Sequence, residues 1–564
     1  MAMAAEERFS RRKHDANLPT QAFRYCLKKA GIHPGEIDCI AYYEIPERKL
    51  ARQLSQGLAF RSGNGLLWMD CELPLHLIRE QWGFSGELRC FPHHLSHAAS
   101  SYFFSGFPDA AIMVLDGVGE WSATSFGKGN GLALTLLESV DFPHSLGLWY
   151  ATLTAYLGFR VNNGEYKVMG LAPYGKPRYL DVMRDMVRSL PGPGIQLDLA
   201  FFDYVAGDSM FSKRLEQRLG RLARQAHEPI LDFHCDVAKS LQVHLEEILL
   251  EKMDYLHRLA GSRNLCLAGG VALNCVANGR IHREGPFEEL FVVPPAGDDG
   301  GCLGAAALAH ASITGTMPGP RPMKHAFFGP EYAACEIWKL LRATGCPFED
   351  FRNRESELLA RTVSALQAFR IVGWFHGRME MGPRALGSRS ILANPLDGDI
   401  RDRLNARVKK REGFRPFAPS VLAAEAGAHF DLNRPSPFML ETCQVQSVLD
   451  LPGITHVDRS ARPQTVDAET APRFAALLRA FHEKTGCPIL VNTSFNLRGE
   501  PIVCTPQEAL RCAVRANLDL LVLGDFVLDL ATVPKAWSEW AEYWPFASRT
   551  QQEAARKDHL YSFV

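Results

Sequence analysis

Residues 265–281, LCLAGGVALNCVANGRI, decide the fold expected for the first half of the chain. The apolar start predicts a buried strand, Gly269 and Gly270 predict a tight turn, and the residues from Asn274 on predict a helix. Glycines let a backbone approach a phosphate, and the amino end of a helix favours an anion. Gly269, Gly270 and Asn274 are therefore candidate nucleotide-binding residues, although close packing of the helix on the sheet would explain the same glycines.

The order of strand, glycine-rich turn and helix recurs on both sides of this stretch. AAIMVLDGVGEW (110–121) is a buried strand that ends in Asp116 and a glycine turn. LFVVPPAGDDGGCLGAAALAHA (290–311) gives a strand, a turn with Asp298 and Asp299, and a helix. The chain has no G-x-x-x-x-G-K-[ST] motif, which excludes a Walker-type phosphate loop. Repeated units of this kind without that motif fit the actin/hexokinase-like ATPase architecture.

Two histidines precede the first of these strands. His93 and His97 stand four residues apart in PHHLSHAASSYFFSGF (92–107), a helical pattern that places both imidazoles on one face. Taken alone, this spacing is also typical of histidines in a packed core. Carboxylates at the carboxyl ends of two strands, from Asp116 and from Asp298 or Asp299, would complete a mononuclear site that suits iron, manganese or zinc.

The second half of the chain contains a cationic stretch, GRMEMGPRALGSRSILANPLDGDIRDRLNARVKKREGFRPFAP (377–419). Its apolar residues Ile400, Leu404 and Val408 recur every four residues and predict an amphipathic helix. The cations of that helix are expected on its solvated surface: Arg401, Arg403, Arg407 and Lys410. Arg384, Arg389 and Arg415 lie instead in turns punctuated by Gly and Pro. A guanidinium held in a packed turn needs an anionic partner, and its planar fork suits phosphate.

Composition limits the class of protein. A length of 564 residues predicts several domains, and 46% hydrophobic with 22% charged residues is typical of a globular protein. The formal net charge of -1, without a basic face, argues against a nucleic-acid partner. Fourteen cysteines without a Cys-x-x-Cys pair indicate reduced thiols. No apolar run is long enough for a membrane helix, and the charged start MAMAAEERFSRRKH does not resemble a signal peptide, so we expect a cytoplasmic location.

Three further predictions concern the organisation of the chain. Residues 4–31 are expected to be helical, with Gly31 as the stop, and residues 37–44 are expected to form a buried strand. TGTMPGPRPMKH (314–325) is rich in Pro and Gly and predicts a linker. We therefore expect one domain over residues 1–320 and a second α/β domain over residues 321–564.

Three long motifs carry a family resemblance: GRMEMGPRALGSRSI (377–391), NARVKKREGFRPFAPSVL (405–422) and VNTSFNLRGEPIVCTP (491–506). They resemble the signatures of the NodU/CmcH-type O-carbamoyltransferases, and the similarity extends from about Ala4 to about residue 530. The resemblance implies an α/β protein with an actin/hexokinase-like (ASKHA, Kae-like) domain followed by a YrdC-like domain. Members of the family begin about 25 to 30 residues earlier with a strand hairpin, which this chain is expected to lack.

The resemblance also implies roles for individual residues. It implies a metal site, usually ferrous iron, formed by His93, His97, Asp116 and Asp299, with Asp298 as the less favoured fourth ligand. It places the block NNGEYKVMGLAPYG (162–175), with Glu165 and Lys167, at the catalytic cleft, where a surface ion pair is the simpler alternative. A carbamoyl phosphate cradle is implied for Arg384, Lys409 and Arg415, where Lys409 and Arg415 would also be catalytic. A facing polar loop would comprise Asn492, Ser494 and Asn496.

The function implied is ATP-dependent carbamoyl transfer. The YrdC-like domain would form carbamoyladenylate from carbamoyl phosphate and ATP with Mg²⁺. The other domain would transfer the carbamoyl group to a hydroxyl of a small natural-product acceptor, as in antibiotic biosynthesis. A tRNA threonylcarbamoyl-type enzyme should show a basic patch, and a hydrogenase maturation protein should show Cys-x-x-Cys pairs. A degenerate scaffold without activity is the third alternative, and the motifs leave open both the acceptor and whether the protein is a homodimer.

Overall fold

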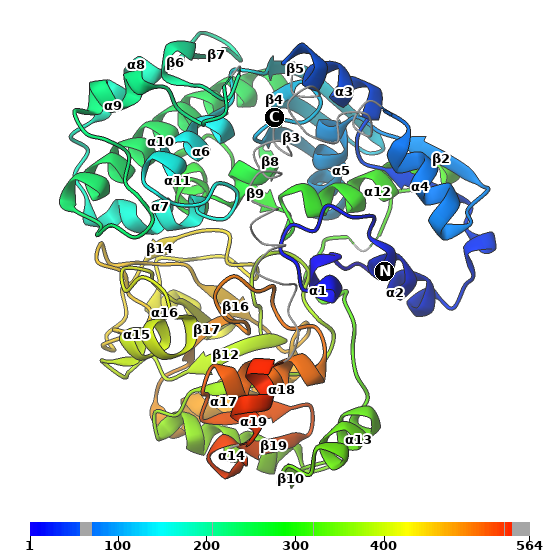
Figure 1. Cartoon of the computed structure of the whole chain (residues 1–564), viewed down its shortest axis with the longest axis vertical. Coiled ribbons are helices and arrows are strands. Elements are labelled where there is room, and N and C mark those ends of the chain that lie inside the picture. Colours follow the sequence, from blue (N-terminus) through cyan, green and yellow to red (C-terminus); the bar gives the residue numbers. More distant parts are fainter. Residues whose placement is uncertain (57–69, 206, 320, 535, 544–564) are drawn as a thin grey trace. The chain divides into compact units, whose positions relative to one another are not determined.

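The chain forms two compact α/β units, described separately below (Figure 1). The computed structural model describes residues 1–56, 70–205, 207–319, 321–534 and 536–543. The histidine unit, named for His93 and His97, spans Gly31–Met323. The lysine unit, named for Lys409, combines Met1–Ala30 with the described residues from Lys324 on. The chain thus passes from the histidine unit to the lysine unit inside the stretch predicted as a linker. The first thirty residues belong to the lysine unit, whereas the sequence predicts that they belong to the first domain.

The histidine unit contains a five-stranded sheet in the order β5-β4-β3-β8-β9. Among these strands β4 alone is antiparallel, since it pairs in that sense with β3 and β5, whereas β8 pairs in parallel with β3 and β9. The two strands expected from the apolar runs, β3 and β8, are buried at nearly every position. The strand bounds are β3 (Asp109–Leu115), β4 (Ser122–Asn130), β5 (Ala133–Asp141), β8 (Asn264–Ala268) and β9 (Glu289–Val292).

Two helices of this unit, α5 (His93–Ser105) and α12 (Gly301–Thr314), pack against each other. A Cβ atom at Gly304 would lie 1.7 Å from the carbonyl oxygen of Ser96, so only glycine allows this approach. Helix α12 also contacts β1 (Cys39–Tyr42), which pairs in parallel with β2 (Glu87–Cys90). The sequence predicts a buried strand here, but β1 is only half-buried, because β1 and β2 form a separate two-stranded sheet.

The remaining elements of the histidine unit include a long helix, α10 (Asp232–Ala260), which contacts α11 (Cys275–Glu284) and α7 (Glu165–Leu171). The others are α3 (Pro46–Ser55), α4 (Leu73–Trp82), α6 (Leu146–Tyr156), α8 (Leu180–Met186), α9 (Lys213–Leu219), β6 (Val187–Ser189) and β7 (Ile195–Leu197). No helix among the described residues is both long enough and apolar enough to cross a bilayer.

The lysine unit contains an eight-stranded mixed sheet in the order β10-β19-β18-β11-β12-β17-β13-β16. Its central strands are buried along their whole length, as expected for strands covered on both faces. The strand bounds are β10 (Glu349–Asp350), β11 (Val372–Phe375), β12 (Arg389–Ala393), β13 (Ala418–Leu422), β16 (Gln464–Val466), β17 (Ile489–Ser494), β18 (Leu520–Leu523) and β19 (Phe526–Asp529).

Helices pack in two groups around this sheet: α14 (Glu355–Gln367) contacts α17 (Pro472–Thr485), and α18 (Pro506–Arg515) contacts α13 (Ala334–Thr344) and α19 (Ala536–Tyr543). The first thirty residues contribute two helices, α1 (Glu7–Ser10) and α2 (Thr20–Ala30), instead of one continuous helix. Gly31 has a positive φ and ends α2, as the sequence predicts. The shorter elements are α16 (Ala426–His429), β14 (Cys443–Gln444) and β15 (Ser460–Ala461).

One edge of the large sheet gathers most of the predicted phosphate-binding motifs. Strands β11, β17 and β18 end at this edge, and β12 and β13 begin there, because both are antiparallel to β17. The turn with Arg384 therefore precedes β12 at the same edge at which Ser494 ends β17. The loop with Arg415 leads into β13 there as well. In α/β sheets, ligands bind beyond the carboxyl ends of the strands, so this edge is where a substrate is expected.

The predicted amphipathic helix forms, and Ile400, Leu404 and Val408 are buried as expected. It changes geometry halfway, from an α-helix, α15 (Ile400–Arg403), to a π-helical turn over Leu404–Lys409. Lys410, in the left-handed region at φ 45°, ends it. Single π-helical turns are uncommon and occur mostly at functional sites. The wider turn ends on Lys409, which faces the interior, whereas an α-helix would rotate that side chain to another direction.

Candidate functional site

Four side chains of the histidine unit converge on one point. The Nε2 atoms of His93 and His97 lie 3.0 Å apart. The Oδ2 atom of Asp116 lies 3.2 Å from Nε2 of His93 and 3.6 Å from Nε2 of His97. The Oδ1 atom of Asp298 lies 3.6 Å and 3.4 Å from the same two nitrogens. The histidines come from the first two turns of α5, Asp116 follows β3, and Asp298 precedes α12, as the strand-end argument requires.

Asp298, rather than Asp299, supplies the fourth member of this cluster. The residue pattern leaves Asp298 and Asp299 open and the family resemblance favours Asp299, whereas the geometry favours Asp298. Asp298 and Asp299 open a short 3₁₀ turn, Asp298–Gly300, before α12. Successive side chains in such a turn point about 120° apart, so two neighbouring carboxylates cannot both face the histidines.

Hydrogen bonds control the protonation of the cluster. Burial disfavours the charged form of His93, but hydrogen bonds to Asp116 and Asp298 outweigh it and raise the pKa of His93 to about 10. The pKa of His97 is raised in the same way against its burial. Burial would raise the pKa of Asp116, yet hydrogen bonds from both histidines hold it well below its usual range. The two carboxylates thus stabilise positive charge on the imidazoles, and a divalent cation that replaced the imidazole protons would balance the same two negative charges.

The geometry of the four residues fits a single divalent ion. Ligand atoms about 2.1 Å from one ion, at angles between roughly 90° and 109°, lie about 3.0 to 3.4 Å apart. The five separations between a histidine nitrogen and another ligand atom run from 3.0 to 3.6 Å, within this range or about 0.2 Å above it. The Nδ1 atom of each histidine is buried and makes no hydrogen bond within the described part of the chain. That of His93 lies 3.9 Å from Oε2 of Glu44, a carboxylate placed to orient the ring once Nε2 binds a metal.

The turn formed by Gly269 and Gly270 contacts Asp116 and the end of β3, next to this cluster. Gly269 has φ 91°, and a Cβ atom there would lie 2.2 Å from the carbonyl oxygen of Leu115. The amide of Gly270 donates a hydrogen bond of 3.1 Å to Oδ1 of Asp116. These contacts give both glycines a packing and orienting role, the alternative to nucleotide binding. Asn274 caps α11 through Oδ1, which accepts from the amide of Ala277.

Glu120 is a supporting residue that the sequence motifs do not single out. Its Oε1 atom accepts hydrogen bonds from the amides of His93, at 3.1 Å, and Ile45, at 2.7 Å. It therefore fixes the first turn of α5, on which both histidines depend. The available signal is its place in the turn DGVGEW, four residues after Asp116.

Glu165 and Lys167 lie at the start of α7, outside the four-residue cluster. The carboxylate of Glu165 accepts hydrogen bonds from the amides of Asn162, at 2.8 Å, and Gly164, at 3.0 Å. Burial raises the pKa of Glu165, and these hydrogen bonds oppose the shift. The ammonium of Lys167 lies over the ring of Phe159 at 5.3 Å. Glu165 therefore shapes its own loop, and Lys167 makes a cation–π contact with Phe159.

Lys409 is the most deeply placed cation of the predicted cradle. It is buried, and its Nζ donates hydrogen bonds to the carbonyl oxygen and, at 3.2 Å, the hydroxyl of Ser494. It also donates to the carbonyl oxygen of Asn496 at 3.1 Å and to its Oδ1 at 2.9 Å. Burial, together with the nearby charges of Arg411 and Arg415, lowers the pKa of Lys409 well below its usual range. The structure therefore brings Lys409, Ser494 and Asn496 together, with Arg415 near.

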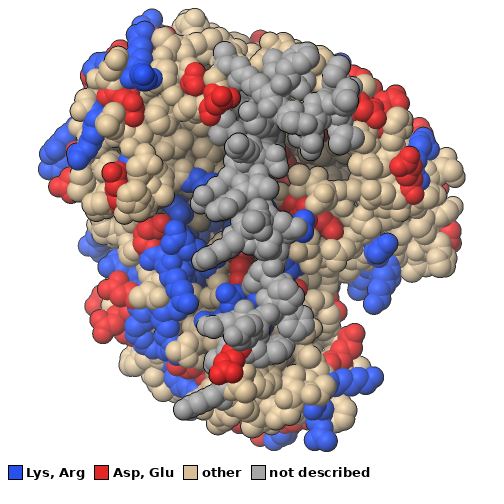
Figure 2. Space-filling view, in the orientation of Figure 1, with Lys and Arg blue, Asp and Glu red and all other residues tan. Residues whose placement is uncertain are grey.

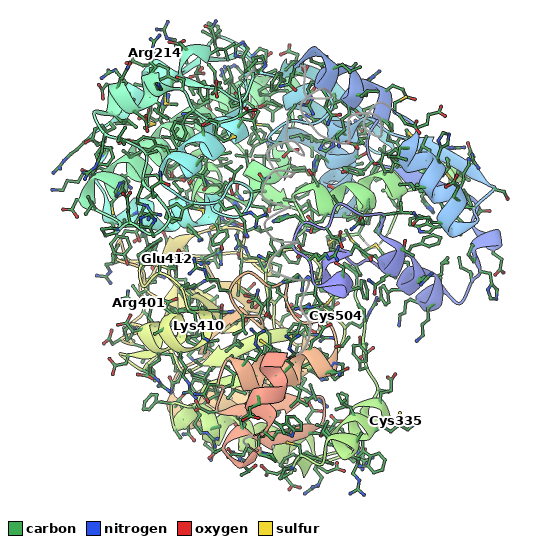
Figure 3. All side chains as sticks on the ribbon, in the orientation of Figure 1. Arg214, Cys335, Arg401, Lys410, Glu412 and Cys504 are labelled. Atoms are coloured by element: carbon green, nitrogen blue, oxygen red, sulfur yellow. The ribbon has the colours of Figure 1, made fainter. Side chains whose placement is uncertain are left out.

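The flanking arginines are more accessible. Arg384 is half-buried in a turn bounded by Gly382 and Gly387, both with positive φ. The Nη1 atom of Arg415 lies 3.7 Å from Oε2 of Glu412. Figure 2 shows Lys and Arg side chains gathered around α15, and Figure 3 places Arg401, Lys410 and Glu412 in that region. Lys410 is exposed, as predicted, whereas Arg401, Arg403 and Arg407 are only half-exposed, and Arg403 pairs with Asp397 at 2.5 Å.

Arg389 has a structural role, in contrast to the anion contact that its turn predicts. Its side chain is fully buried, and its guanidinium lies 3.7 Å from the centre of the Phe375 ring. Within the described residues, its Nη1 and Nη2 atoms donate to main-chain and hydroxyl oxygens of His376, Gly377, Ser388 and Pro330. Such a guanidinium cannot also contact a phosphate at the surface, so Arg389 instead binds the start of β12 to the loop before α13.

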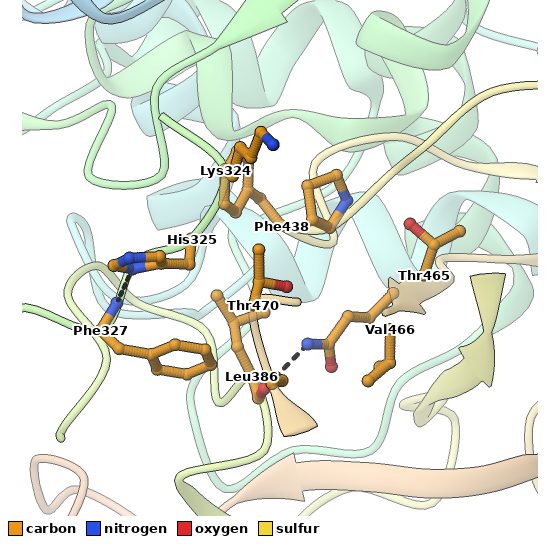
Figure 4. A pocket seen from close by; sticks show the side chains of 12 residues that line it. Lys324, His325, Phe327, Leu386, Phe438, Thr465, Val466 and Thr470 are labelled. Atoms are coloured by element: carbon orange, nitrogen blue, oxygen red, sulfur yellow. Dashed lines mark hydrogen bonds between the residues drawn. The ribbon is translucent and has the colours of Figure 1, made fainter. Parts of the chain in front are cut away.

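Asn492 faces a buried polar network two residues before the end of β17. Its Nδ2 donates to the hydroxyl of Ser420 at 2.9 Å and to Oε1 of Gln464 at 3.1 Å. Gln464 in turn donates to the carbonyl oxygen of Leu386 at 2.8 Å. Figure 4 shows this bond beside a shallow hollow lined by Phe438 and other side chains. Asn492 therefore supports the turn that holds Arg384, and Ser420 and Gln464 join the set of residues that the motifs do not single out.

Comparisons with known proteins agree with this division of the chain. Residues 69–307 match the model of the carbamoyltransferase N-terminus, and residues 363–529 match that of the carbamoyltransferase C-terminus. An uncharacterised protein of Synechocystis sp. is 42% identical over 95% of this chain and 94% of its own length. The nodulation protein NolNO of Sinorhizobium fredii is 35% identical over 98% of this chain and 81% of its own. The 3'-hydroxymethylcephem-O-carbamoyltransferase of Streptomyces clavuligerus is 34% identical over 52% of this chain and 53% of its own length.

Proposed function

This chain belongs to the carbamoyltransferase family, and from that premise we propose that it is an ATP-dependent O-carbamoyltransferase with one half-reaction in each unit. The lysine unit forms carbamoyladenylate from carbamoyl phosphate and ATP. The histidine unit transfers the carbamoyl group to a hydroxyl of a small acceptor. The observation that carries the proposal is the position of Lys409, a buried cation held by Ser494 and Asn496 where strands of a large α/β sheet end.

The fold of each unit supports this assignment. The single antiparallel strand β4 in the five-stranded sheet favours an actin/hexokinase-like domain of the Kae type. The eight-stranded mixed sheet, with its cationic loops at one edge, favours a YrdC-like domain. Both assignments are part of the proposal, and the second connects the Lys409 edge with adenylate formation.

Balanced chemistry defines what the lysine unit must bind. Carbamoyl phosphate, ATP and water give carbamoyladenylate, pyrophosphate and phosphate. One oxygen of the carbamoyl group joins its carbon to the α-phosphorus in the product. That oxygen becomes available only after carbamoyl phosphate has lost its own phosphoryl group to water. Negative charge accumulates on phosphoryl oxygens in this reaction. The ammonium of Lys409 and the guanidinium groups of Arg384 and Arg415 would supply positive charge beside those oxygens. Mg²⁺ would accompany ATP.

The histidine unit would hold a divalent metal, which the family resemblance identifies as ferrous iron, through His93, His97, Asp116 and Asp298. When bound, such an ion acts as a Lewis acid on a carbonyl or phosphoryl oxygen. The protein's own contribution is orientation. Gly270 holds the Asp116 carboxylate and Glu120 holds the first turn of α5, so the ligands need not rearrange.

One relative is named for transfer to a hydroxymethyl group of a cephem, which favours a small hydroxyl-bearing acceptor for this chain as well. The test is incubation of the full chain with ATP, Mg²⁺, Fe²⁺ and labelled carbamoyl phosphate. Carbamoyl-phosphate-dependent exchange of labelled pyrophosphate into ATP is expected. Absence of that exchange, or exchange at the same rate without carbamoyl phosphate, would overturn the proposed first half-reaction. A labelled product with an extract of the source organism would identify the acceptor.

A further inference from the structure

The first thirty residues pack into the lysine unit, although the whole histidine unit follows them in the sequence. Neither family match includes these residues. At one end of the segment, the hydroxyl of Tyr25 donates to the carbonyl oxygen of Phe328 at 2.6 Å. The amide of Met3 donates to the same carbonyl oxygen at 3.2 Å. The segment is therefore attached to the lysine unit through specific main-chain oxygens.

Arg8 connects the segment to the turn that contains Arg384. Its side chain is buried, and Nη2 donates a hydrogen bond of 2.7 Å to the carbonyl oxygen of Gly382. Gly382 has φ 92° and stands two residues before Arg384. Nη1 of Arg8 is buried and makes no hydrogen bond within the described residues. The guanidinium thus fixes one side of the turn and adds a positive charge close to it.

Arg11 connects the segment to the loop that follows β17. Its Nη1 donates to the carbonyl oxygen of Ile502 and its Nη2 to that of Pro501, both at 2.7 Å. Nη1 also lies 3.3 Å from Oε2 of Glu508, at the start of α18. Arg11 itself ends α1, with its backbone in the left-handed region at φ 63°. This conformation turns the chain so that the guanidinium of Arg11 reaches the loop.

A short series of contacts leads from Arg11 to Lys409. The carbonyl oxygen of Glu500, next to Pro501, accepts a hydrogen bond of 2.8 Å from Nδ2 of Asn496. Oδ1 of the same amide accepts from Nζ of Lys409 at 2.9 Å. Movement of residues 500–502 would therefore move the Asn496 side chain and the ammonium that it holds. Arg8 therefore holds the turn with Arg384, and Arg11 holds the loop that contacts Asn496.

We propose that Arg8 and Arg11 are positioning residues for carbamoyl phosphate, so that the start of the chain completes the anion site of the lysine unit. Arg8 holds the turn with Arg384, and Arg11 holds the loop through which Asn496 orients Lys409. This inference rests on the proposed function of that site. A displacement of about 1 Å in a binding group can cost up to about a hundredfold in rate, so loss of either contact has a measurable effect.

The test compares Arg8→Met and Arg11→Met in the full chain with Arg24→Met as the matched control. Arg24 is an exposed arginine of α2 in the same segment. The kinetics of carbamoyl-phosphate-dependent pyrophosphate exchange give KM and kcat, and thermal unfolding gives Tm. We expect KM for carbamoyl phosphate to rise about tenfold in Arg8→Met and in Arg11→Met, and to stay within twofold in Arg24→Met. Arg8→Lys, which keeps the charge and a donor for the carbonyl oxygen of Gly382, should restore most of the affinity.

A purely structural role predicts a different result. If the substitutions only reduce the fraction of folded protein, kcat falls with Tm while KM stays at the wild-type value, and the inference is overturned. If a methionine variant does not fold, Arg8→Gln and Arg11→Gln, which remove the charge and keep a polar side chain, provide the same comparison. Exchange by the wild type with unchanged KM in all variants rejects this inference alone. A wild type that neither exchanges nor binds carbamoyl phosphate in calorimetry rejects the proposed function, and this inference with it.

Discussion

The Nζ atom of Lys409 lies 2.9 Å from Oδ1 of Asn496, with the carbonyl oxygen and hydroxyl of Ser494 as further acceptors. This contact joins the end of a π-helical turn to the loop after β17, two segments more than eighty residues apart. It also places an ammonium among uncharged oxygens, where the charged form is poorly stabilised. The first prediction follows from that environment.

Binding of carbamoyl phosphate should take up protons. Burial lowers the pKa of Lys409, which favours the neutral amine, whereas a bound phosphate dianion favours the charged form and raises that pKa. Protons are then bound together with the ligand, and affinity falls as pH rises between the two pKa values. Calorimetry at a series of pH values below the ordinary pKa of lysine, each in two buffers of different ionisation enthalpy, should show uptake in the wild type and none in Lys409→Met. Equal uptake in both proteins would contradict this assignment.

Asp298 and Asp299 should differ in metal binding. Asp298 faces the two histidines and Asp299 does not belong to the cluster, so only Asp298→Asn removes a charged ligand. We expect Asp298→Asn to weaken Fe²⁺ or Zn²⁺ binding at least tenfold, while Asp299→Asn retains wild-type stoichiometry. Metal analysis after dialysis measures both, with circular dichroism as the control for folding. Loss of metal from Asp299→Asn alone would show that Asp299 is the ligand, as the family resemblance implies.

Arg384→Ala and Arg415→Ala should each weaken carbamoyl phosphate binding by roughly tenfold to a hundredfold, since a charge-assisted contact contributes about 1.5 to 3 kcal/mol. Arg403→Ala is the control. Its guanidinium pairs with Asp397 and donates to the carbonyl oxygen of Phe369, and we expect these contacts to keep it from binding a substrate at the sheet edge. Calorimetric titration gives the three dissociation constants. A loss at Arg403 as large as that at Arg415 would show that another face binds the substrate.

Arg389→Met should act on stability. The buried guanidinium donates to several carbonyl oxygens, and its removal leaves those acceptors unpaired at a cost of about 3 kcal/mol or more. The expected result is a lower Tm with near wild-type affinity for carbamoyl phosphate well below that temperature. If Tm is unchanged and binding is lost, Arg389 contacts the phosphate after all.

Local sequence patterns predicted much of this structure. The apolar runs located β3 and β8, and the spacing of Ile400, Leu404 and Val408 identified the buried face of a helix. The spacing of His93 and His97 placed both rings on one side of α5, because helical periodicity is a property of the local backbone. These features depend on neighbours in the sequence and are therefore visible in it.

Features that depend on distant contacts were not predictable in this way. Whether Asp298 or Asp299 faces the histidines depends on the orientation of the 3₁₀ turn Asp298–Gly300, and distant packing contacts set that orientation. Arg389 and Arg384 occur in one turn with similar neighbours, and only the packing of Phe375 and the loop before α13 separates their roles. The assignment of residues 1–30 to the lysine unit depends on Arg8 and Arg11, whose partners lie more than 370 residues away.

The most direct test of the two-unit account is a pair of assays on Lys409→Ala and His97→Ala in the full chain. The first assay follows carbamoyl-phosphate-dependent exchange of labelled pyrophosphate into ATP, and the second follows transfer from synthetic carbamoyladenylate to an acceptor. The account predicts that Lys409→Ala loses exchange and keeps transfer, whereas His97→Ala keeps exchange and loses transfer. Loss of pyrophosphate exchange in a folded His97→Ala protein would contradict it, because the histidine unit would then be required for the first half-reaction.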